Sequence, residues 1–97
     1  MDQIISLVAR FYKLDDAVLT GRSRTKDVAF ARQMAMYLAR EETDASLPQI
    51  GEALGGRDHT TVMHGWEKIS SQIEQDDRLR REMLSIREEL YSEGRLH

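Results

Sequence analysis

The sequence predicts an all-α protein, a compact helical domain of five to six helices that contains a helix-turn-helix. Apolar residues recur at helical spacing from one end of the chain to the other. The chain has one proline and few runs of β-branched residues, so little interrupts the helical pattern. With 97 residues, 40% of them hydrophobic and 32% charged, we expect residues 1–97 to form a single domain around one modest core.

The composition also limits where the protein can work. The absence of cysteine excludes disulfides and thiolate metal sites, and it agrees with a reducing cytoplasm. No apolar run approaches the roughly 18 residues that a membrane span needs. The N-terminus lacks the basic start and small-residue cleavage site of a signal peptide. We therefore expect a soluble, cytoplasmic protein with no membrane partner.

The first half of the chain predicts two helices and a short helical turn. A helix is expected from residue 2 to about residue 13, a turn of helix over 15–19, and a long helix over about 26–43. The intervening "TGRSRTKD" has little apolar content and indicates a loop. The residues expected to face inward are Ile4, Ile5, Val8, Phe11 and Tyr12 in the first helix and Phe30, Met34, Tyr37 and Leu38 in the long one.

The second half begins with a capping signal. Ser46 is expected to cap a short helix, with Pro48 in its first turn and Gln49 completing a capping box. Gly55 and Gly56 end this helix because glycine readily adopts the left-handed conformation. The inward residues of this short helix are expected to be Leu47, Ile50 and Leu54.

Two further helices are expected after the glycines. Asp58 is expected to cap one of them by accepting from the backbone N–H of Thr60 or Thr61, and this helix runs to about residue 75. The last helix covers residue 76 to about Glu93. Core positions on the first are expected to be Val62, Trp66, Ile69 and Ile73, and those on the second Leu79, Met83, Ile86 and Leu90.

A short helix, a glycine turn and a longer helix over about 46–75 form the outline of a helix-turn-helix. In that motif the first turn of the second helix enters the major groove of DNA. The four residues of that turn are Asp58, His59, Thr60 and Thr61, which offer hydrogen-bonding groups suited to base edges and phosphates. The simpler alternative is an ordinary cap followed by solvated residues.

The charge distribution favours nucleic-acid binding over the simpler alternative of a solvated helix end. The formal net charge is -3, yet residues 21–40 hold five basic residues against one acidic residue. Residues 74–93 hold seven acidic residues and four arginines. Clustered positive charge is the electrostatic footprint of phosphate binding, although any single arginine could equally belong to a solvated face.

Several motifs carry a family resemblance. "GRDHTTVMHGWEKI", preceded by "SLPQIG" and earlier by "ISLVARFY" and "RQMAMYLARE", closely resembles the C-terminal DNA-binding domain, domain IV, of the bacterial chromosomal replication initiators of the DnaA family. The resemblance covers nearly the whole chain. It implies sequence-specific binding to double-stranded DNA at DnaA boxes, short asymmetric sites in replication origins, in support of the initiation and regulation of chromosomal replication.

The resemblance also implies a set of contact residues. Asp58, His59 and Thr60 would read bases in the major groove, and Arg24 in the basic loop would enter the adjacent minor groove. The residues implied as phosphate contacts are Lys26, Arg32, Gln33, Arg40, Pro48, Thr61 and Lys68. No cofactor is implied for this chain, since ATP would bind a separate upstream domain of a full-length initiator. Replication regulatory proteins are possible further partners.

Other classes of function receive less support from the residues. His59 and His64 lie five positions apart, about 140° around a helix, so they do not form the two-histidine metal pair of a metalloprotease. No GxxxxGK[ST] loop is present, and we expect no enzyme activity. A dimeric repressor would need a self-complementary surface and palindromic sites, whereas an asymmetric loop plus helix favours a monomer. The acidic last helix could instead dock a protein.

Overall fold

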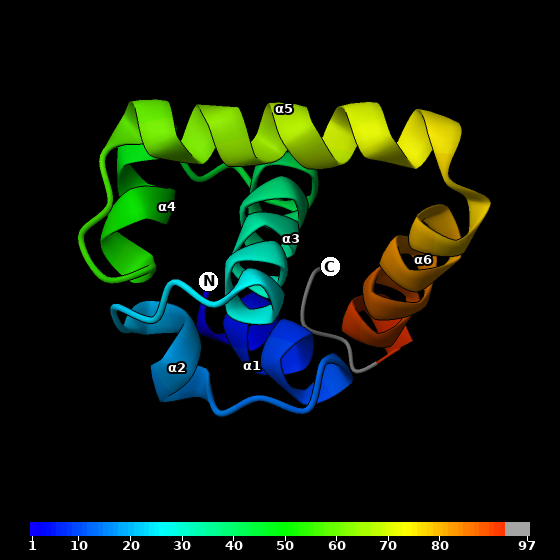
Figure 1. Ribbon diagram of the computed structural model, residues 1–97, viewed down its shortest axis with the longest axis horizontal. Helices are drawn as coiled ribbons and strands as arrows, with labels where there is room; N and C mark the ends of the chain where they lie inside the picture. The colour runs from blue at the N-terminus through cyan, green and yellow to red at the C-terminus, as the bar shows by residue number, and fades with distance from the viewer. Residues whose placement is uncertain (93–97) are drawn as a thin grey trace.

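The computed structural model describes residues 1–92, which form six α-helices and no strand, as the all-α prediction requires. Their bounds are α1 Asp2–Phe11, α2 Asp16–Thr20, α3 Lys26–Glu42, α4 Leu47–Ala53, α5 His59–Gln75 and α6 Asp77–Ser92. In Figure 1, α5 lies across the top, α4 hangs from its N-terminal end and α6 from its C-terminal end. None of these helices is long and apolar enough to cross a membrane.

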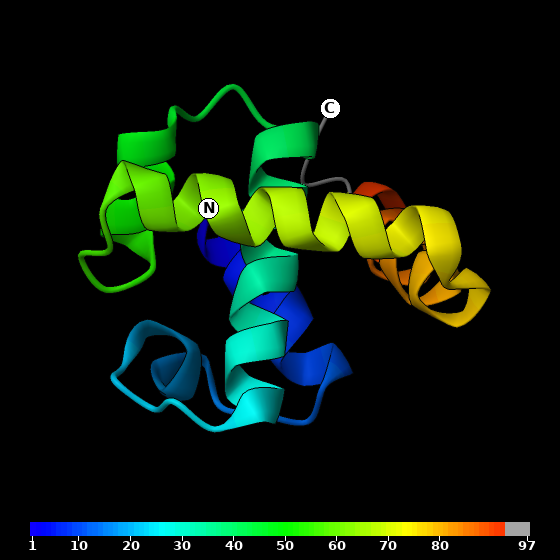
Figure 2. The same cartoon turned by 45° about the horizontal axis from the view of Figure 1, so that its top comes forward.

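Helix α3 forms the centre of the core. It packs against α1, α2, α4, α5 and α6, and Figure 2 shows it crossing beneath α5. Its residues Met34, Ala35 and Leu38 have no exposed surface. The two helices approach closely at Gly65 of α5, where a Cβ atom would lie 2.4 Å from the Met36 sulfur. A small residue at this crossing therefore lets α5 sit directly on α3.

The predicted helix-turn-helix is present as α4 and α5. The Ser46 hydroxyl accepts from the Gln49 N–H at 3.2 Å, and the Gln49 side chain accepts from the Ser46 N–H at 2.8 Å, which confirms the capping box. Gly55 and Gly56 have φ angles of +91° and +84°, the left-handed region expected of them. The turn between the two helices is thus made by glycine stereochemistry.

Helix α1 ends at Phe11, two residues earlier than expected. Lys13 takes a φ of +61°, and its N–H donates to the Arg10 carbonyl at 3.1 Å. The Leu14 N–H donates to the Ala9 carbonyl at 2.8 Å. This pair of bonds is the Schellman arrangement, with a lysine in the position that glycine usually takes. The sequence prediction missed it because lysine gives no such signal.

Two residues expected in the core lie partly outside it. Phe11 is 40% exposed, because the buried face of α1 is centred on Ile4, Val8 and Leu7. Trp66 is only half-buried, whereas its neighbours Val62 and Ile69 are fully buried. The remaining apolar residues of the expected stripes are buried or packed against the core.

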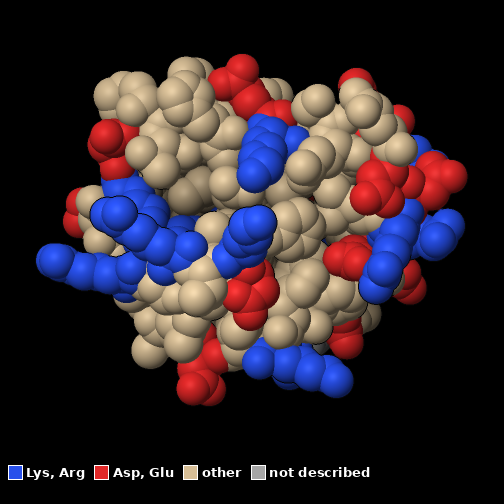
Figure 3. Space-filling model, in the orientation of Figure 1, with Lys and Arg blue, Asp and Glu red and all other residues tan. Residues whose placement is uncertain are grey.

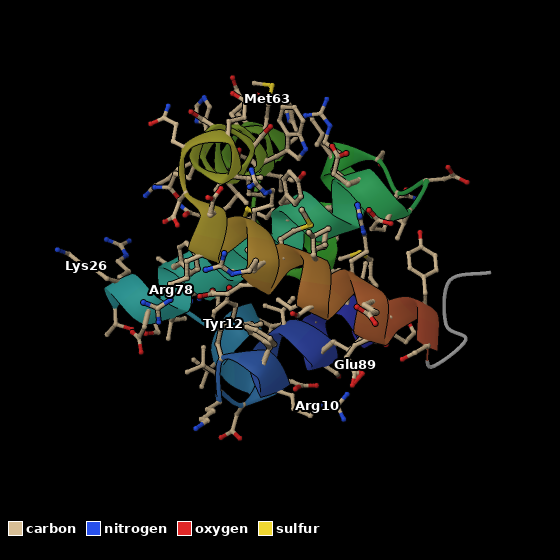
Figure 4. All side chains as sticks on the ribbon, turned by 90° about the vertical axis from the view of Figure 1, so that its right-hand side faces the viewer. Arg10, Tyr12, Lys26, Met63, Arg78 and Glu89 are labelled. Atoms are coloured by element: carbon tan, nitrogen blue, oxygen red, sulfur yellow. The ribbon has the colours of Figure 1, made fainter. Side chains whose placement is uncertain are left out.

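Helix α6 closes the far side of the molecule against α1 and α3. Asp76 caps it, since its carboxylate accepts from the N–H groups of Arg78 and Leu79 at 3.0 and 3.2 Å. The helix therefore starts at Asp77 and not at residue 76, and its expected end at Glu93 lies outside the described residues. Figure 4 shows Tyr12 between α1 and α6, where its hydroxyl donates to the Glu82 carboxylate at 2.9 Å.

Gly51 provides a test of the tight α4 to α5 turn. A Cβ atom at this buried position would lie 1.9 Å from the carbonyl oxygen of Arg57, which is backbone and cannot rotate away. We expect Gly51→Ala to lower the free energy of unfolding by about 1–3 kcal/mol, although alanine favours helix. Urea denaturation followed by circular dichroism measures this loss.

Gly65→Ala is the matched control for that substitution. Its Cβ would meet the Met36 thioether, the flexible end of a side chain, so we expect a smaller loss than at Gly51. Equal stability of Gly51→Ala and the unmodified protein would contradict the packing of Arg57 against α4.

Candidate nucleic-acid interface

The first turn of α5 projects from the protein surface. Asp58, His59, Thr60 and Thr61 are all exposed. The Asp58 carboxylate accepts from the Thr61 N–H at 2.9 Å, the predicted N-cap bond, and from the Thr60 hydroxyl at 2.6 Å. These hydrogen bonds, that of Thr60 first, lower the pKa of Asp58 to about 2. The turn therefore presents an ionised acceptor and two threonines at a free helix end.

Met63 extends this exposed turn along α5. It follows His59 by four residues and Thr60 by three, the spacing of one helix face, and it is half-buried. Figure 4 shows Met63 on the outer side of α5. An apolar side chain at this position suits contact with a thymine methyl group. Met63 is absent from the residues expected from the sequence, although its helical spacing from His59 and Thr60 places it on their face.

The basic loop 21–25 lies on the same side of the molecule as the turn between α4 and α5. Arg22 and Arg24 are exposed on this loop. The two segments border an open cavity of about 440 Å³ lined by Gly21, Arg22, Ser23, Arg24, Arg32, Gly55 and Arg57. None of these residues is acidic. Figure 3 shows the corresponding gathering of Lys and Arg side chains on the left of the molecule, where the loop and the turn meet in Figure 1.

Arg32 holds the basic loop to the body of the protein. Its side chain is only 7% exposed. The guanidinium donates to four backbone carbonyls, those of Leu19 at 2.8 Å, Ser23 and Val18 at 3.2 Å and Gly21 at 3.4 Å. Burial lowers its pKa, and the nearby charge of Arg57 lowers it further. Arg32 thus ties the loop to α3 from within, and the phosphate contact that the resemblance implies for it stays a prediction.

Arg57 is a second arginine that bonds to the basic loop. It is not among the site residues expected from the sequence. It is half-buried, and burial lowers its pKa. Its guanidinium donates to the carbonyl of Leu54 at the end of α4 and to that of Gly21 at 2.7 Å. The two partners lie 3 and 36 residues away along the chain. No local sequence pattern predicts the contact between Arg57 and Gly21, because the two residues are 36 positions apart.

Three predicted phosphate contacts gather at the groove between α3 and α5. Lys26, Gln33 and Lys68 line a cavity of about 580 Å³. Lys26 and Gln33 are seven residues apart, nearly two helical turns, so they share a face of α3. Figure 4 shows Lys26 at the outer end of that helix. The structure thus brings Lys26 and Gln33 of α3 and Lys68 of α5 to the same groove.

Arg40 continues that face of α3, seven residues beyond Gln33. Its guanidinium carbon lies 4.1 Å from the centre of the Trp66 ring, a cation–π contact. The Trp66 N–H donates to the Glu41 carboxylate at 2.8 Å. Trp66 therefore supports an exposed arginine instead of filling the core. Pro48, the remaining residue of the implied set, is exposed in the first turn of α4.

The four bonds of Arg32 predict its effect on stability. In Arg32→Met the apolar stem is kept while the donors to four carbonyls are lost. We expect the free energy of unfolding to fall by about 1–3 kcal/mol, because buried carbonyls are left without partners. Urea denaturation measures the loss. The exposed Arg22→Met is the control, and equal stability of the two variants would contradict a structural role for Arg32.

The Asp58 cap predicts a change of stability with pH. Its pKa is about 2 in the folded protein, below the value of about 3.9 for an unfolded chain. Ionised Asp58 therefore stabilises the fold above about pH 4, and this contribution is lost as the pH falls through 2. Asp58→Asn keeps a capping side chain that does not titrate. We expect the stability difference between the two proteins to change between pH 4 and pH 2 in thermal unfolding, with exposed Asp44→Asn as control.

Comparison with known proteins agrees with the architecture of α4 and α5. Residues 1–69 match the family model described as bacterial DnaA protein helix-turn-helix. The chain is 52% identical over 93 residues, 96% of its length, to a chromosomal replication initiator protein DnaA of Herpetosiphon aurantiacus. It is 53% identical over 89 residues, 92% of its length, to that of Roseiflexus castenholzii.

A third relative is the chromosomal replication initiator protein DnaA of Latilactobacillus sakei, 49% identical over 90 residues and 93% of the chain. The chain spans about a fifth of the length of these relatives, 20%, 18% and 20% respectively. Six helices, a helix-turn-helix at α4 and α5, and these matches lead to one conclusion: the chain belongs to the bacterial DnaA helix-turn-helix family.

Proposed function

We propose that this chain binds double-stranded DNA sequence-specifically, as a monomer, at DnaA-box-like sites of a replication origin, and so supports the initiation and regulation of chromosomal replication. The observation that carries the proposal is the exposed first turn of α5 beside a cavity lined by four arginines and no acid. Relatives named as chromosomal replication initiators share about half of their aligned residues with this chain. In this proposal the protein acts in the cytoplasm, on the nucleoid.

Base reading is assigned to two elements on one side of the molecule. The first turn of α5 enters the major groove, where Asp58 accepts from a cytosine amino group and His59 and Thr60 meet neighbouring base edges. Arg24, exposed on the loop, enters the adjacent minor groove, where a narrow A·T-rich segment attracts a guanidinium. Together the two elements would read both grooves of a single duplex.

Phosphate binding is assigned to the exposed cations and the helix ends around those readers. Lys26, Arg40 and Lys68 supply positive charge along the groove between α3 and α5. Thr61, Gln33 and the start of α4 at Pro48 add hydrogen-bond donors from side chains or backbone. These contacts fix the orientation of the duplex without choosing its sequence.

The structure weighs against the protein-docking alternative. The apolar stripe of α6, which a partner protein would need, is buried against α1, α3 and α5. A loop and a helix end on one side of the molecule also form an asymmetric surface, which suits a non-palindromic site better than the paired half-sites of a dimeric repressor. In a longer initiator, binding of ATP would belong to another domain.

Fluorescence anisotropy tests the proposal with a DnaA-box duplex and a scrambled duplex at fixed salt. We expect His59→Ala and Thr60→Ala each to cost about 1–3 kcal/mol on the box and little on the scrambled duplex. Lys68→Gln should weaken both duplexes alike, because phosphates are common to both. With about six phosphate contacts, the slope of log affinity against log salt should be roughly -5.

Arg78→Gln is the matched control, since it removes one exposed positive charge that is already paired with Glu82, on a helix, α6, that carries none of the proposed contacts. It should leave the affinity for both duplexes nearly unchanged. Equal affinity of the unmodified protein for the box and the scrambled duplex would overturn base reading by α5.

A further inference from the structure

The carbonyl of Gly21 receives two arginines from different parts of the fold. Arg32 on α3 donates to it at 3.4 Å, and Arg57, next to the cap of α5, donates at 2.7 Å. Arg24 follows Gly21 by three residues, and Asp58 follows Arg57 immediately. One carbonyl thus joins the loop assigned to the minor groove with the helix end assigned to the major groove.

The same joint is supported by backbone packing. A Cβ atom at Gly55 would lie 2.1 Å from the carbonyl oxygen of Thr20, so the turn before α5 touches the residue at the end of α2. The other end of the Arg57 guanidinium donates to the carbonyl of Leu54. A planar guanidinium that donates to two carbonyls has little freedom to rotate, unlike the single ammonium group of a lysine. The joint is therefore stiff.

We infer that Arg57 is a positioning residue that sets the distance between the two DNA-reading elements, and thereby fixes which spacing of minor-groove and major-groove base pairs the protein accepts. The inference rests on the proposed function. Arg57 need not touch DNA for this role. Its guanidinium acts through the loop, by holding Arg24 at one place relative to His59 and Thr60.

The geometry of DNA makes this distance matter. Inserting one base pair moves the two parts of a site apart by about 3.4 Å and turns them by about 35°. A loop fixed at Gly21 cannot follow that movement, so one element loses its base contacts. A loop freed from Arg57 stays tied to α3 through Arg32 but can shift relative to the start of α5, at the cost of ordering its residues on each duplex that it binds.

The test compares a DnaA-box duplex with a duplex carrying one additional base pair between the minor-groove and major-groove parts, located by hydroxyl-radical footprinting. For the unmodified protein we expect the insertion to lower affinity roughly 10- to 100-fold, the effect of losing one or two base pairs of contact. For Arg57→Lys we expect the affinity for the box to fall about tenfold and the loss on insertion to shrink to a few-fold.

Salt dependence separates positioning from charge. Arg57→Lys keeps the positive charge, so its slope of log affinity against log salt should match that of the unmodified protein. Arg22→Gln removes a charge from the same loop without touching the joint; it should weaken binding to every duplex and leave the spacing preference intact. Circular dichroism verifies that each variant is folded at the temperature of measurement.

A second variant covers the case in which Arg57→Lys does not fold. One glycine inserted between Ser23 and Arg24 leaves Arg57 and Gly21 unchanged but lengthens the tether to Arg24. The inference requires this variant to tolerate the additional base pair as well.

The outcomes separate the inference from the function on which it rests. Failure of the unmodified protein to prefer the box over a scrambled duplex overturns the proposed function. A protein that prefers the box but tolerates the insertion, or a folded Arg57→Lys or glycine-insertion variant that keeps the full spacing penalty, overturns the positioning role alone.

Discussion

The buried guanidinium of Arg32 is the interaction on which the basic side of this molecule depends. Residues 21–25 form neither helix nor strand, so their carbonyls have no ladder of backbone donors to satisfy them. Arg32 reaches out of the central helix and supplies donors to Ser23, Gly21 and the end of α2. Arg32 thereby ties the loop to α3, the centre of the core, and links α3 directly to the surface that we propose meets DNA.

The parts of the fold that follow from sequence are those with short-range causes. The capping box of Ser46, the glycine turn and the Asp58 cap all involve partners within three residues, and each was confirmed. The missed features depend on distant partners: Arg32 bonds to residues 9–14 positions away, and Arg57 to one 36 positions away. Trp66 shows a further limit, since helical spacing places a residue on a face without saying which neighbour covers it. The contact residues for DNA stay predictions.

The separation of charge explains how a chain with a net charge of -3 can present a basic surface. Arg78 and Arg80 pair with carboxylates on α6 itself, and Arg87 pairs with Glu42 at the end of α3. The loop arginines instead line a cavity without an acidic residue. Acidic charge is thus concentrated around α6, while the positive potential around the loop remains available to a polyanion.

The hydrogen bond between the Thr60 hydroxyl and the Asp58 carboxylate has a consequence for how strictly a sequence can be recognised. In the free protein this pair is already satisfied, so docking exchanges one internal bond for an external one and gains little from the exchange itself. In the proposed complex an incorrect base pair leaves the internal bond in place, so neither side chain is left without a partner in the groove. A self-satisfied pair of this kind adds modestly to affinity for the correct site and penalises an incorrect one equally modestly, so strict selection falls to the other base-reading side chains.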